Sequence, residues 1–77
     1  MIDDMEYIWF DYSKLRGRIK EIFEFEVTFA KALGMSKTSL SMKLNGKGDF
    51  TQSEIMKACN LLDIPNEEIN VYFFNGL

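Results

Sequence analysis

The side chains best suited to chemistry in this sequence form a run of short polar and basic residues. They lie between Lys37 and Lys43, inside a stretch that has no acidic residue from position 27 to position 48. Hydroxyl and ammonium groups donate hydrogen bonds to phosphates and to the edges of bases, and no carboxylate stands beside them in sequence to repel a nucleic acid. This run predicts recognition of double-stranded DNA.

Residues that would support catalysis or metal binding are scarce. Histidine is absent and Cys59 is the only cysteine, which excludes a Cys/His zinc cage, an intramolecular disulfide and a His-dependent triad. Residues 46–49, Gly-Lys-Gly-Asp, lack the spacing of a phosphate-binding loop. We therefore expect no enzyme activity, no cofactor and no small-molecule substrate. Four acids that could flank a metal are interpreted as a solvated end: Asp3, Asp4, Glu6 and Asp11.

The charge is unevenly distributed along the chain. Nine basic and twelve acidic residues give a net charge of −3, which taken alone argues against a nucleic-acid partner. However, residues 12–48 hold eight bases and three acids, whereas residues 49–77 hold five acids and only Lys57. Residues 1–11 hold four acids and no base. The middle is a candidate nucleic-acid surface, and a plain solvated surface is the alternative.

Length and composition predict one small globular domain. A chain of 77 residues cannot support two cores, and 47% hydrophobic residues are enough for one. No uncharged stretch approaches the roughly 20 apolar residues that span a bilayer, and the first ten residues carry acids where a signal peptide needs cations. We expect a soluble, cytoplasmic protein without membrane contact.

Hydrophobic spacing and capping residues predict five helices. The first begins after Asp11 as N-cap, and its apolar face holds Leu15, Ile19, Ile22 and Phe23. The second runs from about Val27 to a stop at Gly34, and the third is capped by Ser36 and ends at Asn45 and Gly46. A capping box from Thr51 to Glu54 opens the fourth, in which Cys59 is expected as a buried hydrophobe. The fifth spans Asn66 to Phe74.

The second and third predicted helices are joined by a tight turn. Two helices that cross steeply over such a turn need a small residue at their close approach and a glycine where the chain reverses, and Ala30 and Gly34 supply them. With Phe29, Leu33, Met35 and Leu40 anchoring the pair, the outward face of the third helix would carry Lys37, Thr38, Ser41 and Lys43. Such a face can enter a major groove.

These residues resemble the helix-turn-helix domain of small phage regulators of the Cro and lambda-repressor-like class, and especially short phage proteins described as Cro repressors. The resemblance runs from Phe10 to Phe74 and is carried by FDYSKLRGRI, FAKALGMSKTSLSMKLNGKG and ACNLLDI. It implies an all-α, compact five-helix lambda-repressor-like DNA-binding domain. The single domain would cover residues 1–77, with an N-terminal extension at 1–10 and the helix-turn-helix at 27–45.

The resemblance also implies a DNA site. Residues matching base-reading positions are Lys37, Thr38 and Met42, with Ser41 beside them, and residues matching phosphate contacts are Lys43, Asn45 and Lys47. Arg16 and Arg18 are either surface charges or further phosphate contacts. Glu26 departs from the pattern, because family members often have a phosphate-bonding Gln there and a carboxylate would repel the backbone. Lys43 also departs, so we expect Leu44 to take the inward place.

The resulting functional hypothesis is a phage or prophage repressor that binds operator DNA as a homodimer. We expect no oligomerisation or cleavage domain beyond residue 77, which favours the Cro type. A helix presents only one stripe to a core, so the dimer is expected to form through surplus aromatic residues of the last helix: Tyr72, Phe73 and Phe74.

The alternative hypothesis is a protein-interaction module, an antirepressor or antitoxin-like adaptor, that uses its acidic, aromatic ends. The net charge and Glu26 favour this alternative. Residues 7–10, Tyr-Ile-Trp-Phe, would pack on the bundle, bind a partner, add a helix, or belong partly to a start-site artefact ahead of Met5. Packing is the preferred interpretation for Trp9 and Phe10.

Overall fold

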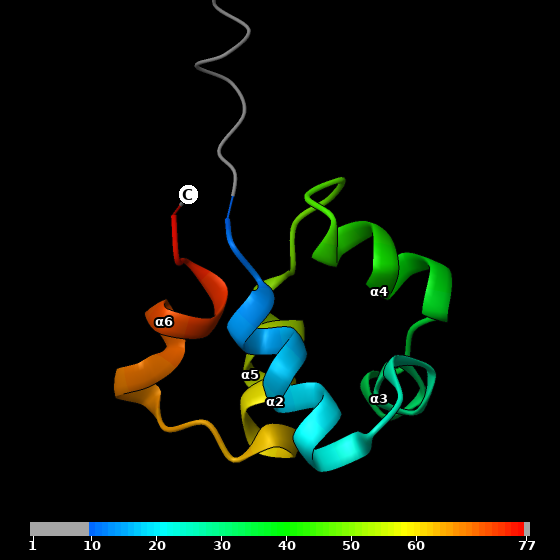
Figure 1. Cartoon of the computed structure of the whole chain (residues 1–77), viewed down its shortest axis with the longest axis horizontal. Helices are drawn as coiled ribbons and strands as arrows, with labels where there is room; N and C mark the ends of the chain where they lie inside the picture. The colour runs from blue at the N-terminus through cyan, green and yellow to red at the C-terminus, as the bar shows by residue number, and fades with distance from the viewer. Residues whose placement is uncertain (1–9, 77) are drawn as a thin grey trace, which may run out of the picture.

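A computed structural model describes residues 10–76 of the chain (Figure 1). Over these residues the chain folds into five α-helices and one short 3-10 helix, and its strand-type pairing is limited to an isolated antiparallel bridge between Phe10 and Gly76. The predicted all-α, five-helix architecture is confirmed. The elements are α2 (Ser13–Phe23), α3 (Glu26–Leu33), α4 (Lys37–Leu44), α5 (Gln52–Leu62), η1 (Asn66–Glu68) and α6 (Ile69–Phe73).

The predicted capping residues set the ends of the three central helices. The Ser36 hydroxyl accepts a hydrogen bond from the Ser39 amide at 3.0 Å and begins α4. Thr51 and Glu54 form a reciprocal capping box at the start of α5. Gly34 ends α3 with φ of 84°, a left-handed conformation that glycine adopts without steric cost. The turn between α3 and α4 is therefore written in local sequence.

The first and last helices differ from their predicted bounds. Asp11 accepts a hydrogen bond from the Ser13 amide at 2.9 Å, and this bond lowers the pKa of the Asp11 carboxyl, but the helix begins two residues later. The predicted fifth helix is divided into η1 and α6. Its first turn is tighter because the Glu68 amide donates to the Pro65 carbonyl, three residues back, at 2.9 Å.

All five α-helices contribute buried side chains to one core. The predicted positions Leu15, Phe29, Leu40 and Leu62 are fully enclosed, and Cys59 is buried, which raises the pKa of its thiol. Ile22 was expected inward but is exposed. The chain turns away directly after α2, and Phe23 packs edge-on against Phe29 with ring centroids 5.2 Å apart, so the neighbouring ring takes the inward place.

Candidate functional site

The residues predicted to read bases lie on α4, on the side of the domain opposite α6 (Figure 1). Lys37, Thr38 and Met42 are exposed, and Ser41 is half-buried. Leu40 and Leu44 are buried, so Leu44 takes the inward place as expected. The exposed face of α4 thus presents the predicted hydroxyl and ammonium groups to solvent, while its other face anchors the helix to the core. Base contact itself stays a prediction.

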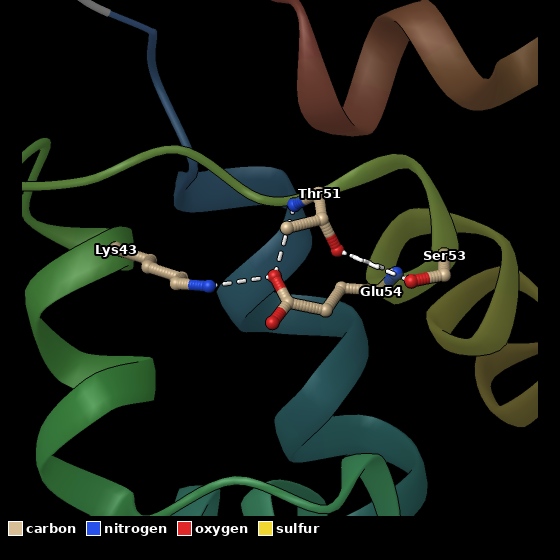
Figure 2. A network of polar contacts seen from close by, with 4 residues as sticks. All are labelled: Lys43, Thr51, Ser53 and Glu54. Atoms are coloured by element: carbon tan, nitrogen blue, oxygen red, sulfur yellow. Dashed lines mark hydrogen bonds and ion pairs between the residues drawn. The ribbon is translucent and has the colours of Figure 1, made fainter.

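Lys43 does not face outward, so that part of the sequence prediction is wrong. Its Nζ donates to Oε1 of Glu54 at 2.6 Å (Figure 2) and lies 5.9 Å from the centroid of the Phe50 ring. The same Glu54 oxygen accepts the Thr51 amide at 2.9 Å. Burial alone raises the pKa of Glu54, but the hydrogen bonds from Lys43 and Thr51 outweigh it and hold the pKa below its ordinary value. Lys43 joins α4 to the start of α5, and a phosphate contact would require it to leave Glu54.

Arg16, Glu26 and Asn45 meet at what we call the charged corner. The Arg16 guanidinium donates to Oε2 of Glu26 at 3.1 Å and to Oδ1 of Asn45 at 2.9 Å. These residues come from α2, from the first turn of α3 and from the end of α4, so one guanidinium links three elements. A hollow of about 480 Å³ adjoins the corner and is also lined by Lys20 and by three further residues, Ile19, Glu24 and Phe25.

The other predicted phosphate contacts are divided between two places. Lys47 is exposed in the loop after α4, near Asn45 in sequence. Arg18 lies elsewhere, because its Nε donates to the Leu62 carbonyl at the end of α5, at 2.9 Å, and its other nitrogen donates to Glu21 at 2.9 Å. The structure therefore brings Arg16 and Asn45 together and directs Arg18 toward the end of α5.

A second candidate surface, the aromatic groove, lies between the start of α5 and the two ends of the described chain. It comprises two hollows of about 380 and 600 Å³, and Ile55 and Phe74 line both of them. Phe10 packs edge-on against Phe74 at 5.6 Å, and Phe50 does the same against Phe73 at 5.5 Å. The remaining lining residues are Tyr12, Asp49, Gln52, Ser53, Met56 and Ile69.

Sequence reasoning did not single out Phe50 or Tyr12, which both line the groove. Phe50 precedes the N-cap Thr51, and Ile55 is the fourth residue of the helix that follows, which is the spacing of a hydrophobic staple. That signal was present in the sequence. Tyr12 packs edge-on against Phe50 at 5.5 Å, and burial followed by the charge of Asp49 raises the pKa of its hydroxyl.

The three C-terminal aromatic residues have different environments. Phe73 is 1% exposed, so a dimer contact through Phe73 is wrong, because this ring belongs to the domain's own core. Phe74 is 48% exposed, and Tyr72 is half-buried with the Lys14 ammonium 5.5 Å from its ring centroid. The expectation that the last helix cannot bury all three is confirmed. Phe10 packs on the domain as predicted, whereas Trp9 lies outside the described residues.

Other kinds of site find no support in the part of the chain that the structure describes. Within residues 10–76 no three His, Cys, Asp or Glu side chains gather as a metal site would require. None of the helices described there has the length and apolar character needed to cross a bilayer.

A compact, all-helical domain of this kind is consistent with a small helical phage regulator. The chain belongs to the DUF739 family, described as a protein of unknown function, whose model matches residues 8–76. It is also similar to a solved structure, the modulator of repression (MOR) of the temperate bacteriophage TP901-1 from Lactococcus lactis. Sequence identity is 41%, the TM-score is 0.75, and the match covers 86% of this chain and 89% of that one.

The comparisons refine the family resemblance that the sequence suggested. No curated protein sequence matches the chain. The similar structure is that of a modulator of repression, so a regulatory role in a phage is supported at this level, whereas the Cro type stays a prediction.

Proposed function

We propose that this protein regulates a phage or prophage switch by binding another protein, the repressor of the same switch, through the aromatic groove. The observation that carries the proposal is the open end of the groove. Phe74 is 48% exposed and Met56 is 54% exposed, and both line one apolar hollow. Exposed apolar patches of this kind mark protein-binding sites, and aromatic residues supply most of the binding energy there.

The charge around the groove specifies the chemistry of the partner. Residues 49–77 hold five acids and one base, Lys57, and Asp49 lines the groove itself. A DNA-binding repressor carries a basic surface where it meets phosphate. An apolar groove with one acidic residue in its lining is complementary to an apolar anchor side chain with a Lys or Arg beside it. Covering such a surface would hinder operator binding, which is one physical route to modulation of repression in the host cytoplasm.

The basic side chains of the middle segment favour a protein partner as well. Arg16, Arg18 and Lys43 each donate to a carboxylate of the same chain, at 3.1, 2.9 and 2.6 Å. Cations held in this way attract phosphate less than free ones do, because the paired carboxylate cancels their field. The similarity to a modulator of repression points in the same direction.

The test is a titration of the wild-type protein with the repressor encoded in the same phage genome, followed by calorimetry. Phe74→Ala should weaken binding by about tenfold or more, since central aromatic contacts typically contribute at least ~2 kcal/mol. Val71→Ala is the matched control, because Val71 is also exposed on α6 but does not line the groove. Equal loss in both variants, or no complex with the wild type, would contradict the proposal.

A second candidate function is operator binding through α4, with dimerisation through Tyr72 and Phe74. The exposed Lys37 and Thr38 favour it. Lys37→Ala should then cost ~1–3 kcal/mol on the operator and relax one base preference, whereas Lys47→Ala should weaken all DNA equally and make the salt slope shallower by about one per subunit. A gel shift with the DNA flanking the protein's own gene, against random competitor DNA, separates this function from the first.

A further inference from the structure

We propose that Glu26 excludes the DNA backbone from the α3–α4 side of the domain. Its carboxylate occupies, from within the chain, the place on Arg16 that a phosphate oxygen would otherwise take. The inference deepens the proposed function, since it explains how a domain with an exposed polar helix would bind a protein in preference to nucleic acid. Glu26 would thereby determine which class of partner the domain binds.

The geometry of the charged corner carries the inference. Arg16 holds Glu26 at 3.1 Å and Asn45 at 2.9 Å, and its side chain is 37% exposed while that of Glu26 is 26% exposed. The pair therefore lies at the surface, where a ligand can reach it. A guanidinium fork matches a carboxylate and a phosphate equally well, so the two anions would compete for the same donors.

The hollow beside the corner shows the same balance of charge. Of its lining residues, Arg16 and Lys20 are cationic, whereas Glu24 and Glu26 are anionic. Because two cations and two carboxylates line this hollow, a phosphate that entered it would gain little net attraction. Asn45 also connects the corner to the end of α4. Through Arg16 and Asn45, Glu26 is thus linked to the end of the helix that carries the predicted base-reading residues.

A second internal pair follows the same arrangement. Glu54 binds Lys43 at 2.6 Å, and Lys43 belongs to the acid-free stretch of residues 27–48. Glu26 precedes that stretch in sequence and Glu54 follows it. In the folded chain each carboxylate pairs with a cation at or beside α4, Glu26 with Arg16 and Glu54 with Lys43. Of the two acids, Glu26 is the more informative to change, because Glu54 also caps α5 and its loss would disturb the helix.

The experiment measures binding of a short labelled DNA duplex of random sequence by fluorescence anisotropy, at several salt concentrations. Glu26→Gln should raise affinity by about tenfold or more and steepen the salt slope by about one, as expected for one new phosphate contact. Glu67→Gln is the control, because it removes the same charge from η1, on the side of the domain away from α3 (Figure 1). It should change affinity by less than about twofold.

A second variant identifies the group that receives the phosphate. Arg16→Ala in the Glu26→Gln background should remove the gain, with circular dichroism verifying that each variant is folded. If Glu26→Gln gains no more than Glu67→Gln, if Arg16→Ala leaves the gain intact, or if the wild type already binds as tightly as Glu26→Gln, the inference is overturned.

Repressor binding is measured in parallel, so that the two proposals fail separately. Glu26 does not line the aromatic groove, so Glu26→Gln should bind repressor as the wild type does. A wild-type protein that binds no repressor would refute the proposed function, and the DNA measurement would still decide the role of Glu26. Gain of DNA binding together with unchanged repressor binding supports both.

Discussion

The charged corner and the aromatic groove differ in whether their side chains have partners within the chain. At the corner, Arg16 donates hydrogen bonds to Glu26 and Asn45, so the carboxylate of Glu26 offsets the charge of the guanidinium within the chain. In the groove, Phe74 packs one edge against Phe10 and leaves the rest of its ring in water. The comparison shows that the charge of a segment in the sequence does not by itself indicate what its folded surface can bind. Three of the eight bases of the basic segment are paired with carboxylates of the same chain, and the acidic segment carries most of the open apolar site.

Within the groove, the buried ring of Phe73 should contribute to stability and the exposed ring of Phe74 to binding. Removal of the buried ring gives the largest expected effect on the free energy of unfolding. Phe73 is 1% exposed and contacts Phe50, so Phe73→Ala should lower the free energy of unfolding by about 3–5 kcal/mol. Phe74→Ala should lower it by less than about 1 kcal/mol, because much of that ring already meets solvent. Urea denaturation measures both. Equal destabilisation by the two variants would mean that the groove is part of the core.

The turn between α3 and α4 depends on a left-handed backbone conformation, and Gly34 tests this dependence. Gly34 has φ of 84°, and the nearest atom to a Cβ placed there is the Lys57 Nζ at 3.8 Å, so an added methyl group has space. Gly34→Ala should therefore cost about 1–2 kcal/mol for conformational reasons alone.

Gly17 provides the matched control for Gly34. It lies inside α2, where a Cβ would have nothing within 4 Å, so Gly17→Ala should stabilise by about 0.5–1 kcal/mol. Thermal unfolding compares the two variants. A neutral Gly34→Ala would show that the turn between α3 and α4 tolerates another geometry.

The features that sequence could predict are those decided by near neighbours. The Ser36 cap, the capping box of Thr51 and the Gly34 stop each depend on residues within a few positions, and the structure has them as predicted. The ion pairs of Lys43 and Arg16 bring together residues eleven and ten positions apart, from different elements. Long side chains choose such partners only after the helices have packed, so no local pattern announces them.

The groove was partly predictable for the same reason. The hydrophobic staple is a local signal, and the crowding of aromatic residues after Asn70 was visible in the sequence. The η1 turn after Pro65 leads directly into α6, in which Phe73 is the aromatic residue that enters the core. The sequence interpretation did not decide among Tyr72, Phe73 and Phe74, although Tyr72 and Phe73 follow Ile69 at helical spacing, three and four residues later.

Low pH tests the link between α4 and α5, which is the ion pair of Lys43 and Glu54. The pKa of Glu54 is lowered in the folded protein, so its ionisation stabilises the fold above the ordinary value of 4.5 and this contribution is lost as pH falls through the folded pKa. Glu54→Gln should cost about 1 kcal/mol near neutral pH, through the weakened capping box and the lost Lys43 pair.

The pH dependence supplies the discriminating measurement for Glu54. The urea midpoints of wild type and Glu54→Gln should approach each other as pH falls below 4.5. Glu68→Gln, on the exposed η1 turn, serves as the reference for removal of a carboxylate from the surface. A gap between wild type and Glu54→Gln that does not narrow in acid would assign the loss to packing and not to charge.

The smallest effect on stability is expected at the charged corner, and it bears most directly on the comparison. Arg16 is 37% exposed and Glu26 is 26% exposed, and pairs at such partly solvated sites contribute about 0.5 kcal/mol, since solvent screens them and both side chains lose freedom. A double-mutant cycle with Arg16→Ala and Glu26→Gln should give a coupling energy of that order in urea unfolding. A coupling above about 2 kcal/mol would make the pair a structural element. A small coupling energy, together with a tenfold change in DNA affinity for Glu26→Gln, would mean that the Arg16–Glu26 pair serves selectivity between partners and not stability.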